Sequence, residues 1–251
     1  KKVVLGVGIS TDSGPRMSVE HTNHKLPWLG WRALSKLSLD DKTRSIATEL
    51  TAPPDADNWR WITSVQVQRQ KSDGIDVGNQ RWRGGRRQDS DPLDRSYYLE
   101  YDRADTAAST DAVAIVAQAL SVNYAMTLRR FDNMPFPTRG WGLGVVVGGG
   151  ATLGIQQDPF TRVLARGRYY LPLAGTHAGA ATQLRAGRLV LRAEGGAVWA
   201  KEGVALPRTQ LFMTGGDTTV RGYSYRELGV VGADGLVDPG RFMVNGGLEW
   251  Q

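Results

Sequence analysis

The chain has 251 residues, of which 41% are hydrophobic and 22% charged, and its 31 Lys and Arg against 25 Asp and Glu give a formal charge of +6. The longest apolar run, Ala112–Leu120, is about half of the roughly 20 residues that a membrane helix requires, which excludes a helical membrane protein. A membrane β-barrel is not excluded, because its strands are apolar on one face only. The arginines are scattered, whereas nucleic-acid binding favours a basic patch or tail.

Alternation of apolar and polar residues recurs along the chain, in segments of about 8–15 residues separated by Gly, Asp, Asn and Pro. Helical periodicity is almost absent. The pattern predicts about twelve strands, in chain order Val3–Asp12, Pro15–Lys25, Trp31–Asp40, Thr43–Ala52, Trp59–Lys71, Gly78–Arg87, Arg95–Ala104, Ala117–Arg130, Trp141–Leu153, Thr161–Leu171, Arg188–Ala200 and Arg241–Gln251. Tight turns are predicted at Asp12–Gly14 and Asp40–Lys42, and a fixed, proline-containing turn at Asp132–Gly140.

The two faces of the predicted strands differ in chemistry. In Arg188–Ala200, Leu191 and Trp199 share one face, whereas Arg192 and Glu194 share the other. The polar faces carry Arg, Gln, Glu and Asp with many glycines, which suits a crowded aqueous lumen. The apolar faces carry aromatic residues near the segment ends, as the interfacial girdles of a membrane barrel require. A large soluble β-sandwich is the alternative.

The longest interval without alternation runs from Lys201 to Gly240, and long structureless loops in compact domains are usually functional. Within it, Arg221 lies in a glycine-rich stretch, and its guanidinium can bridge lumenal carboxylates bidentately. We expect Gly222 to let the backbone approach the barrel wall closely. Alternation in the last predicted strand turns Glu249 inward, which makes it the best candidate to hold Arg221.

This stretch resembles the sixth extracellular loop of the Omp85 superfamily, which presents a Val-Arg-Gly-Phe/Tyr tip. The corresponding residues here are Val220, Arg221, Gly222 and Tyr223, and the preceding Gly215, Gly216 and Asp217 are similar to the translocation and assembly module (TamA) type. Three other segments resemble that family in the same order. Residues 5–16 are similar to its first hairpin, residues 130–141 to the turn before its ninth strand, and residues 246–250 to the strand after its sixth loop.

The resemblance implies a transmembrane antiparallel β-barrel, with about twelve strands of a sixteen-stranded barrel present. It implies one outer-membrane domain over residues 1–251, without N-terminal POTRA domains and without the last four strands, and a loop at residues 201–240 that folds into the lumen. It also implies that Glu249 clamps Arg221, together with an Asp on a later strand. The first strand would form half of a lateral gate through Val3, Leu5, Gly6, Val7, Gly8 and Ile9. Gly6 and Gly8 weaken a strand ladder, although they are equally explained by barrel curvature.

The function implied is an outer-membrane pore of a Gram-negative bacterium that inserts or secretes β-barrel or autotransporter clients. Outer-membrane lipid, unfolded clients and an inner-membrane-anchored, TamB-like protein are the expected partners, and nucleic acid is not. A two-partner secretion pore and a passive solute channel are the alternatives. We expect no enzyme, cofactor or metal site, because the sequence has no nucleophile elbow, Walker loop or Cys. Its three His are scattered, and the acidic run Asp89–Asp94 lacks the Gly and distal Glu of a calcium-binding EF-hand loop.

Overall fold

The computed structural model describes residues 1–10, 14–72, 75–107, 115–154, 157–173, 187–216, 219–223, 227–232 and 237–251. These residues form one twelve-stranded antiparallel sheet and a two-stranded ribbon. The sheet contains β1 (Lys2–Ser10), β2 (Gly14–Asn23), β3 (Arg32–Leu39), β4 (Thr43–Thr51), β5 (Trp59–Ser72), β6 (Ile75–Gln88), β7 (Leu93–Ala107), β8 (Ile115–Phe131), β9 (Gly140–Thr152), β10 (Pro159–Pro172), β11 (Arg188–Ala200) and β14 (Phe242–Trp250). The ribbon pairs β12 (Val230–Val231) with β13 (Val237–Asp238).

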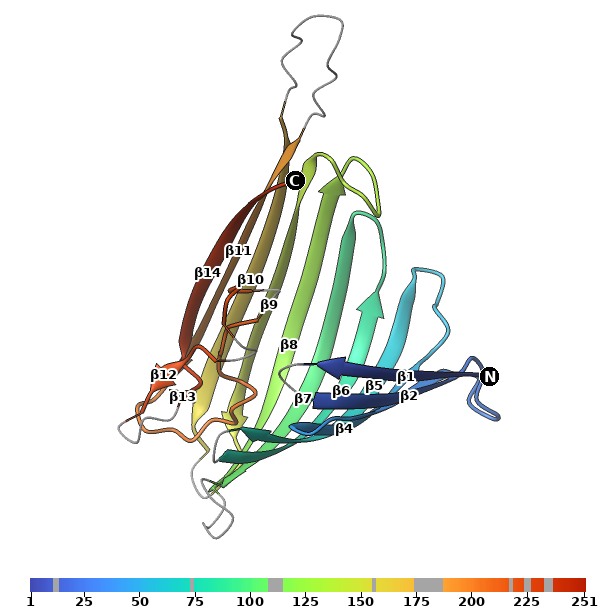
Figure 1. Cartoon of the computed structure of the whole chain (residues 1–251). Helices are drawn as coiled ribbons and strands as arrows, with labels where there is room; N and C mark the ends of the chain where they lie inside the picture. Colours follow the sequence, from blue (N-terminus) through green and yellow to red (C-terminus); the bar gives the residue numbers. More distant parts are fainter. Residues whose placement is uncertain are drawn as a thin grey trace, which may run out of the picture.

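Each strand of the sheet pairs with its neighbour in sequence, and β14 pairs with β11, so that β1 and β14 are the two edges of the described sheet. The sheet is strongly curved; part of the connection between β11 and β14 lies on its concave side, whereas β12 and β13 lie at the ends of the strands (Figure 1). The twelve predicted strands are therefore confirmed, as is the antiparallel all-β class. The expectation of a structureless interval at residues 201–240 is wrong, because this segment contains β12, β13 and two isolated bridges, Phe212 with Gly240 and Thr214 with Leu228.

The two faces of the sheet are inverted relative to a water-soluble protein. On β11, the apolar Leu191 and Trp199 are 46% and 53% exposed. On β7, by contrast, Glu100 and Asp102 are buried on the opposite face. We call the face of Leu191 the outer face and the face of Glu100 the inner face. A sheet that exposes its apolar face and buries its charged face is typical of a strand layer surrounded by lipid and enclosing water.

The outer face also carries an aromatic cluster at one end of the long strands. Trp59 stacks on Tyr97 with ring centroids 5.5 Å apart, and Tyr97 lies 5.1 Å from Tyr124. The guanidinium groups of Arg86 and Arg95 lie over the ring of Trp59, at 5.5 and 5.7 Å from its centroid. Amphipathic rings of this kind favour the boundary between hydrocarbon and headgroups. Within the described ranges, no helix has the length and hydropathy needed to span a bilayer.

Two of the predicted turns are closed by aspartate side chains. Asp40 Oδ1 accepts hydrogen bonds from the amides of Lys42 and Thr43, at 3.0 and 2.6 Å. Asp132 accepts one from the Thr138 hydroxyl and others from backbone amides, which hold the pKa of this carboxyl well below its usual range. The predicted turn at Asp12–Gly14 lies largely outside the described residues.

Candidate functional site

The connection between β11 and β14 contacts the inner face of the sheet at two separate places. We call residues 204–214 the loop shoulder and residues 219–223 the loop tip. The shoulder packs against β7, β8, β10 and β11, whereas the tip contacts Glu249 of β14. These two attachments define the candidate functional site.

The loop shoulder is first held by apolar packing. Leu206 and Phe212 are buried in one cluster with Ala119 of β8, Phe160 and Leu164 of β10 and Val198 of β11. The ring of Phe212 lies flat against Gly196 of β11, since a Cβ added there would be only 2.5 Å from the Cζ atom of the ring. A glycine on the inner face therefore creates the space that the phenyl ring occupies.

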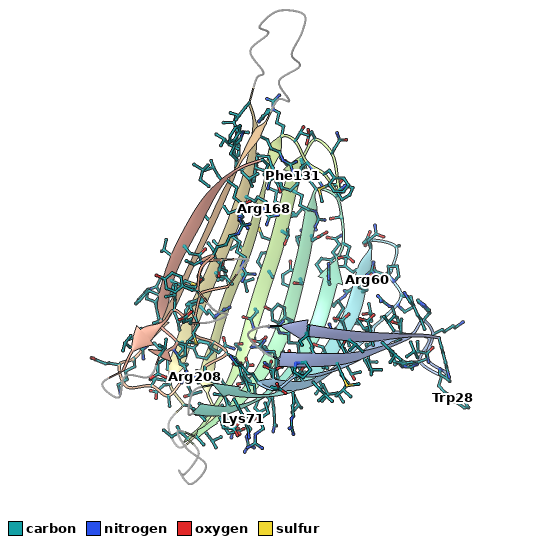
Figure 2. The ribbon with its side chains drawn as sticks, in the orientation of Figure 1. Trp28, Arg60, Lys71, Phe131, Arg168 and Arg208 are labelled. Carbon is teal, nitrogen blue, oxygen red and sulfur yellow. The ribbon has the colours of Figure 1, made fainter. Side chains whose placement is uncertain are left out.

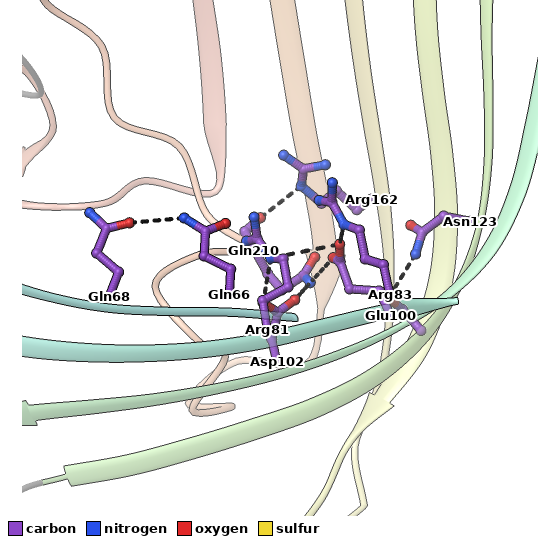
Figure 3. Close-up of polar contacts among 10 residues, drawn as sticks. Gln66, Gln68, Arg81, Arg83, Glu100, Asp102, Asn123, Arg162 and Gln210 are labelled. Atoms are coloured by element: carbon purple, nitrogen blue, oxygen red, sulfur yellow. Dashed lines mark hydrogen bonds and ion pairs between the residues drawn. The ribbon is translucent and has the colours of Figure 1, made fainter. Parts of the chain in front are cut away.

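A buried polar cluster around Gln210 also holds the loop shoulder (Figure 3). The Gln210 amide donates hydrogen bonds from Nε2 to Glu100 Oε1 at 2.9 Å and to Asp102 Oδ2 at 2.5 Å. The three side chains are almost fully buried. The two carboxylates stand two residues apart on the same face of β7, so one amide can bridge them. A single loop residue thereby satisfies two buried wall carboxylates.

Arginines from neighbouring strands balance the charge of these carboxylates. Arg81 Nε of β6 lies 2.8 Å from Asp102 Oδ1, and Arg83 of β6 pairs with Glu100. Arg162 of β10 donates from Nε to the Gln210 carbonyl oxygen at 2.9 Å, and its guanidinium lies 4.9 Å from the Phe212 ring centroid. Because both carboxylates are buried, removing a partner arginine would leave a buried charge uncompensated and destabilise the fold. Arg162 links the polar and the apolar halves of the shoulder contact.

The loop tip is held by a shared carboxylate. Arg221 Nη2 lies 2.8 Å from Glu249 Oε1, and Arg192 of β11 pairs with the same oxygen atom. Glu249 is therefore on the inner face, as the alternation in β14 predicts, and the structure brings it together with Arg221. The Arg221 side chain is 65% exposed, whereas that of Glu249 is 19% exposed. The tip attachment is accordingly more open to solvent than the shoulder.

Three glycines with positive φ lie in or just before the tip, Gly215 at 116°, Gly216 at 102° and Gly222 at 93°. The Gly216 amide donates to the Tyr223 carbonyl oxygen at 3.0 Å, which closes the loop on itself. The expectation that Gly222 permits close contact with the wall is wrong, because nothing lies within 4 Å of a Cβ added there. Its value is the left-handed backbone conformation, which side-chain-bearing residues adopt at a cost. Val220 is partly buried, Tyr223 is 49% exposed, and Asp217 lies outside the described residues.

The tip borders a cavity of about 630 Å³ that extends along the inner faces of β8 to β11 and β14. Its lining combines five charged side chains, Arg129, Arg166, Arg168, Arg192 and Glu194, with apolar side chains and glycines, and it includes Thr219 of the tip. Arg166 Nε donates to Glu194 Oε1 at 2.6 Å.

The predicted gate residues are all on β1, which is remote in the sheet order from the loop tip. In the described sheet β1 pairs only with β2, over the register Lys2 with Thr22 to Ser10 with Gly14. Val3, Leu5, Val7 and Ile9 are exposed along it. A Cβ added at Gly8 would meet nothing within 4 Å, whereas one at Gly6 would lie 2.6 Å from the Ser18 hydroxyl oxygen.

Sequence reasoning missed Gln210 and the whole shoulder contact. The available signal was the presence of Leu206, Leu211 and Phe212 in the interval between the strands, together with Val198 on the charged face of β11. Apolar residues on both sides of that interface could have indicated that the interval packs on the wall. Among the residues that the structure describes, no group of three His, Asp or Glu is arranged to hold a metal ion.

The fold and the site together define a class of protein, a curved antiparallel β-sheet with a lipid-suited outer face and a connection that packs on its charged inner face. The Omp85 superfamily domain model matches residues 19–251, and the chain therefore belongs to the Omp85 superfamily. No protein among the curated sequences matches the chain.

Among solved structures, the chain is similar to the crystal structure of BamA from Haemophilus ducreyi lacking POTRA domains 1–3. The TM-score is 0.76 at 16% sequence identity, and the match covers 99% of this chain and 52% of that chain. The chain thus spans about half the length of the BamA structure that it matches. At this identity the likeness shows a shared fold.

Proposed function

We propose that this chain forms the membrane-spanning part of a pore that inserts or translocates proteins at the outer membrane of a Gram-negative bacterium. Membership of the Omp85 superfamily and the inverted faces of the sheet support this proposal. The observation that carries it is the ion pair between Arg221 and Glu249, which holds the loop tip against the inner face. A connection fixed in this way can position polar chain within the pore.

The finer proposal is a pore of the translocation and assembly module type, with β-barrel or autotransporter clients and an inner-membrane-anchored partner similar to TamB. The Gly-Gly-Asp stretch at residues 215–217 before the Val-Arg-Gly-Tyr tip supports it. In this proposal, the exposed edge of β1 pairs with a client strand by β-augmentation. Its exposed apolar residues would face lipid while the backbone is being paired.

Arg221→Ala in the intact protein tests the proposal. We expect client insertion into liposomes to fall by about fivefold. Weakening the docking of the tip by about 1 kcal/mol changes the equilibrium constant between docked and undocked tip by about that factor. Arg168→Ala is the matched control, because Arg168 lines the same cavity but lies on β10 and outside the tip. Normal client insertion with altered ion selectivity would contradict the proposal and favour a passive solute channel. Secretion of a soluble client without any insertion would favour a two-partner secretion pore.

A glycine substitution tests the proposed role of β1. Gly8→Ala has space for its methyl group and should stabilise the strand by roughly 0.5–1 kcal/mol. If β1 must separate from its neighbour to accept a client, we expect slower insertion together with a slightly raised unfolding midpoint. Gly167→Ala is the control, since Gly167 also has open space but lies in β10, between two paired strands. Equal insertion by both variants would contradict a gate at β1.

A further inference from the structure

The turn between β2 and β3 presents an unusually exposed tryptophan. Trp28 is fully exposed, and its neighbour Leu29 is 50% exposed. Figure 2 shows Trp28 projecting beyond the sheet, away from every other labelled side chain. Hydrogen bonds from Leu26 N to the Trp31 carbonyl at 2.7 Å and from Gly30 N to the Leu26 carbonyl at 3.0 Å close the turn. The side chain therefore projects from a hydrogen-bonded turn.

The backbone of Trp28 is in a conformation that bulky residues rarely adopt. Its φ is 69°, in the left-handed region where only Gly, Asn and Asp are common. Strain of this kind persists only where the surrounding structure enforces it, and it is often associated with function. Here it directs an indole ring outward, where no described residue covers it.

A second turn at the same end of the sheet provides a comparison. Asn58, between β4 and β5, has a φ of 62° and is also exposed. Its turn is polar, and Asp55 Oδ1 accepts hydrogen bonds from the amides of Asp57 and Trp59 at 3.1 and 2.8 Å. Asn tolerates this backbone conformation and is well solvated. The β2–β3 turn adopts the same conformation with an apolar tip instead.

The surroundings of Trp28 point to a phospholipid interface as the occupant. The turn joins β2 and β3, whose exposed apolar side chains Met17, Val19 and Leu37 lie further along the outer face, beyond the polar pair His21 and Ser35. Lys25 is exposed beside the apolar tip, where an ammonium group can contact lipid phosphates. Tryptophan itself prefers the headgroup level of a bilayer. The turn thus combines a cation and an interfacial residue at the end of two strands that carry exposed apolar side chains on their outer face.

We propose that Trp28 and Leu29 insert into the headgroup region of the bilayer leaflet at the end of the sheet opposite the residue 201–240 connection. The inference rests on the proposed membrane location, to which it adds a specific lipid-binding turn. The antiparallel order places the β2–β3 turn at the strand ends opposite those joined by the β11–β14 connection. Trp28 anchors the β1–β4 side of the sheet to lipid, beside the edge strand β1.

Site-specific fluorescence tests this proposal. The chain has no Cys, so a single Cys introduced on a background without other cysteines carries a unique environment-sensitive probe. Leu29→Cys, Asn58→Cys and Val65→Cys are labelled in the intact protein, which is reconstituted in liposomes with or without brominated phospholipid. Val65 is an outer-face residue of β5 that should contact lipid if the sheet spans the membrane.

We expect brominated lipid to quench the probes at residues 29 and 65 strongly and the probe at residue 58 at least twofold less. Adding Trp28→Ser should reduce the quenching at residue 29 by about half and leave that at residue 65 unchanged. Quenching at residue 65 but not at residue 29 would overturn the lipid anchor and leave the membrane location intact. A probe at residue 29 that is shielded from water but not quenched would instead indicate a protein contact, and this too overturns the proposal. Lack of quenching at residue 65 would overturn the membrane location itself.

Discussion

The loop shoulder and the loop tip attach the same connection to the same wall by different means. The shoulder buries Phe212 in an apolar cluster and Gln210 between two carboxylates, whereas the tip contacts Glu249 through a guanidinium that is 65% exposed. An exposed ion pair contributes at most about 1 kcal/mol. Buried packing and buried hydrogen bonds contribute more. The recognisable motif of the chain is therefore not its strongest contact.

We therefore expect the shoulder to determine how stably the connection is attached and the tip to determine what the connection contacts in the cavity. The shoulder should determine whether the connection stays on the inner face, because Leu206, Gln210 and Phe212 are buried there. The tip determines which residues the connection presents to the cavity of about 630 Å³. Substitutions at the two places should therefore affect different measurements.

Phe212→Ala should give the largest loss of stability. Removing a buried phenyl ring costs about 3–5 kcal/mol, and Gly196 beneath it cannot fill the space. Urea unfolding of the intact protein in liposomes measures the change. Phe136→Ala is the control, since that ring is 79% exposed in the β8–β9 turn and should change stability little. Equal effects of the two variants would show that the shoulder does not hold the connection.

Gln210→Ala should have an intermediate effect of about 1–3 kcal/mol, because it removes hydrogen bonds from two buried carboxylates. The same unfolding measurement applies, with Gln80→Ala on the exposed part of β6 as the control. Limited proteolysis within residues 201–240 should also become faster for Gln210→Ala. Unchanged proteolysis and unchanged stability would argue that Glu100 and Asp102 are satisfied by Arg81 and Arg83 alone.

Arg221→Ala should have the smallest effect on stability, at most about 1 kcal/mol, although it impairs client insertion. Comparing its unfolding midpoint with that of Gln210→Ala sharpens the distinction between tip and shoulder. If Arg221→Ala unfolds as easily as Phe212→Ala, the tip is a principal structural contact and the distinction fails.

The sequence was sufficient to predict the strands and the side of the sheet on which each side chain lies, because both follow from a period of two residues. The inward orientation of Glu249 on β14 follows from that alternation. The position of Gln210 does not, because it depends on which wall residues the connection meets after the sheet has curved. The motif correctly includes Gly222, but the reason for the glycine is its positive φ and not close contact with the wall. A positive φ cannot be predicted from residue type alone.

The sharing of Glu249 between Arg192 and Arg221 makes undocking of the tip asymmetric. When Arg221 withdraws, the carboxylate keeps Arg192, so the wall does not expose an uncompensated anion. Withdrawal of Gln210 leaves Asp102 with Arg81 and Glu100 with Arg83, but it removes a buried amide that donates to both carboxylates. The exposed loop tip should consequently undock from the wall more readily than the buried loop shoulder.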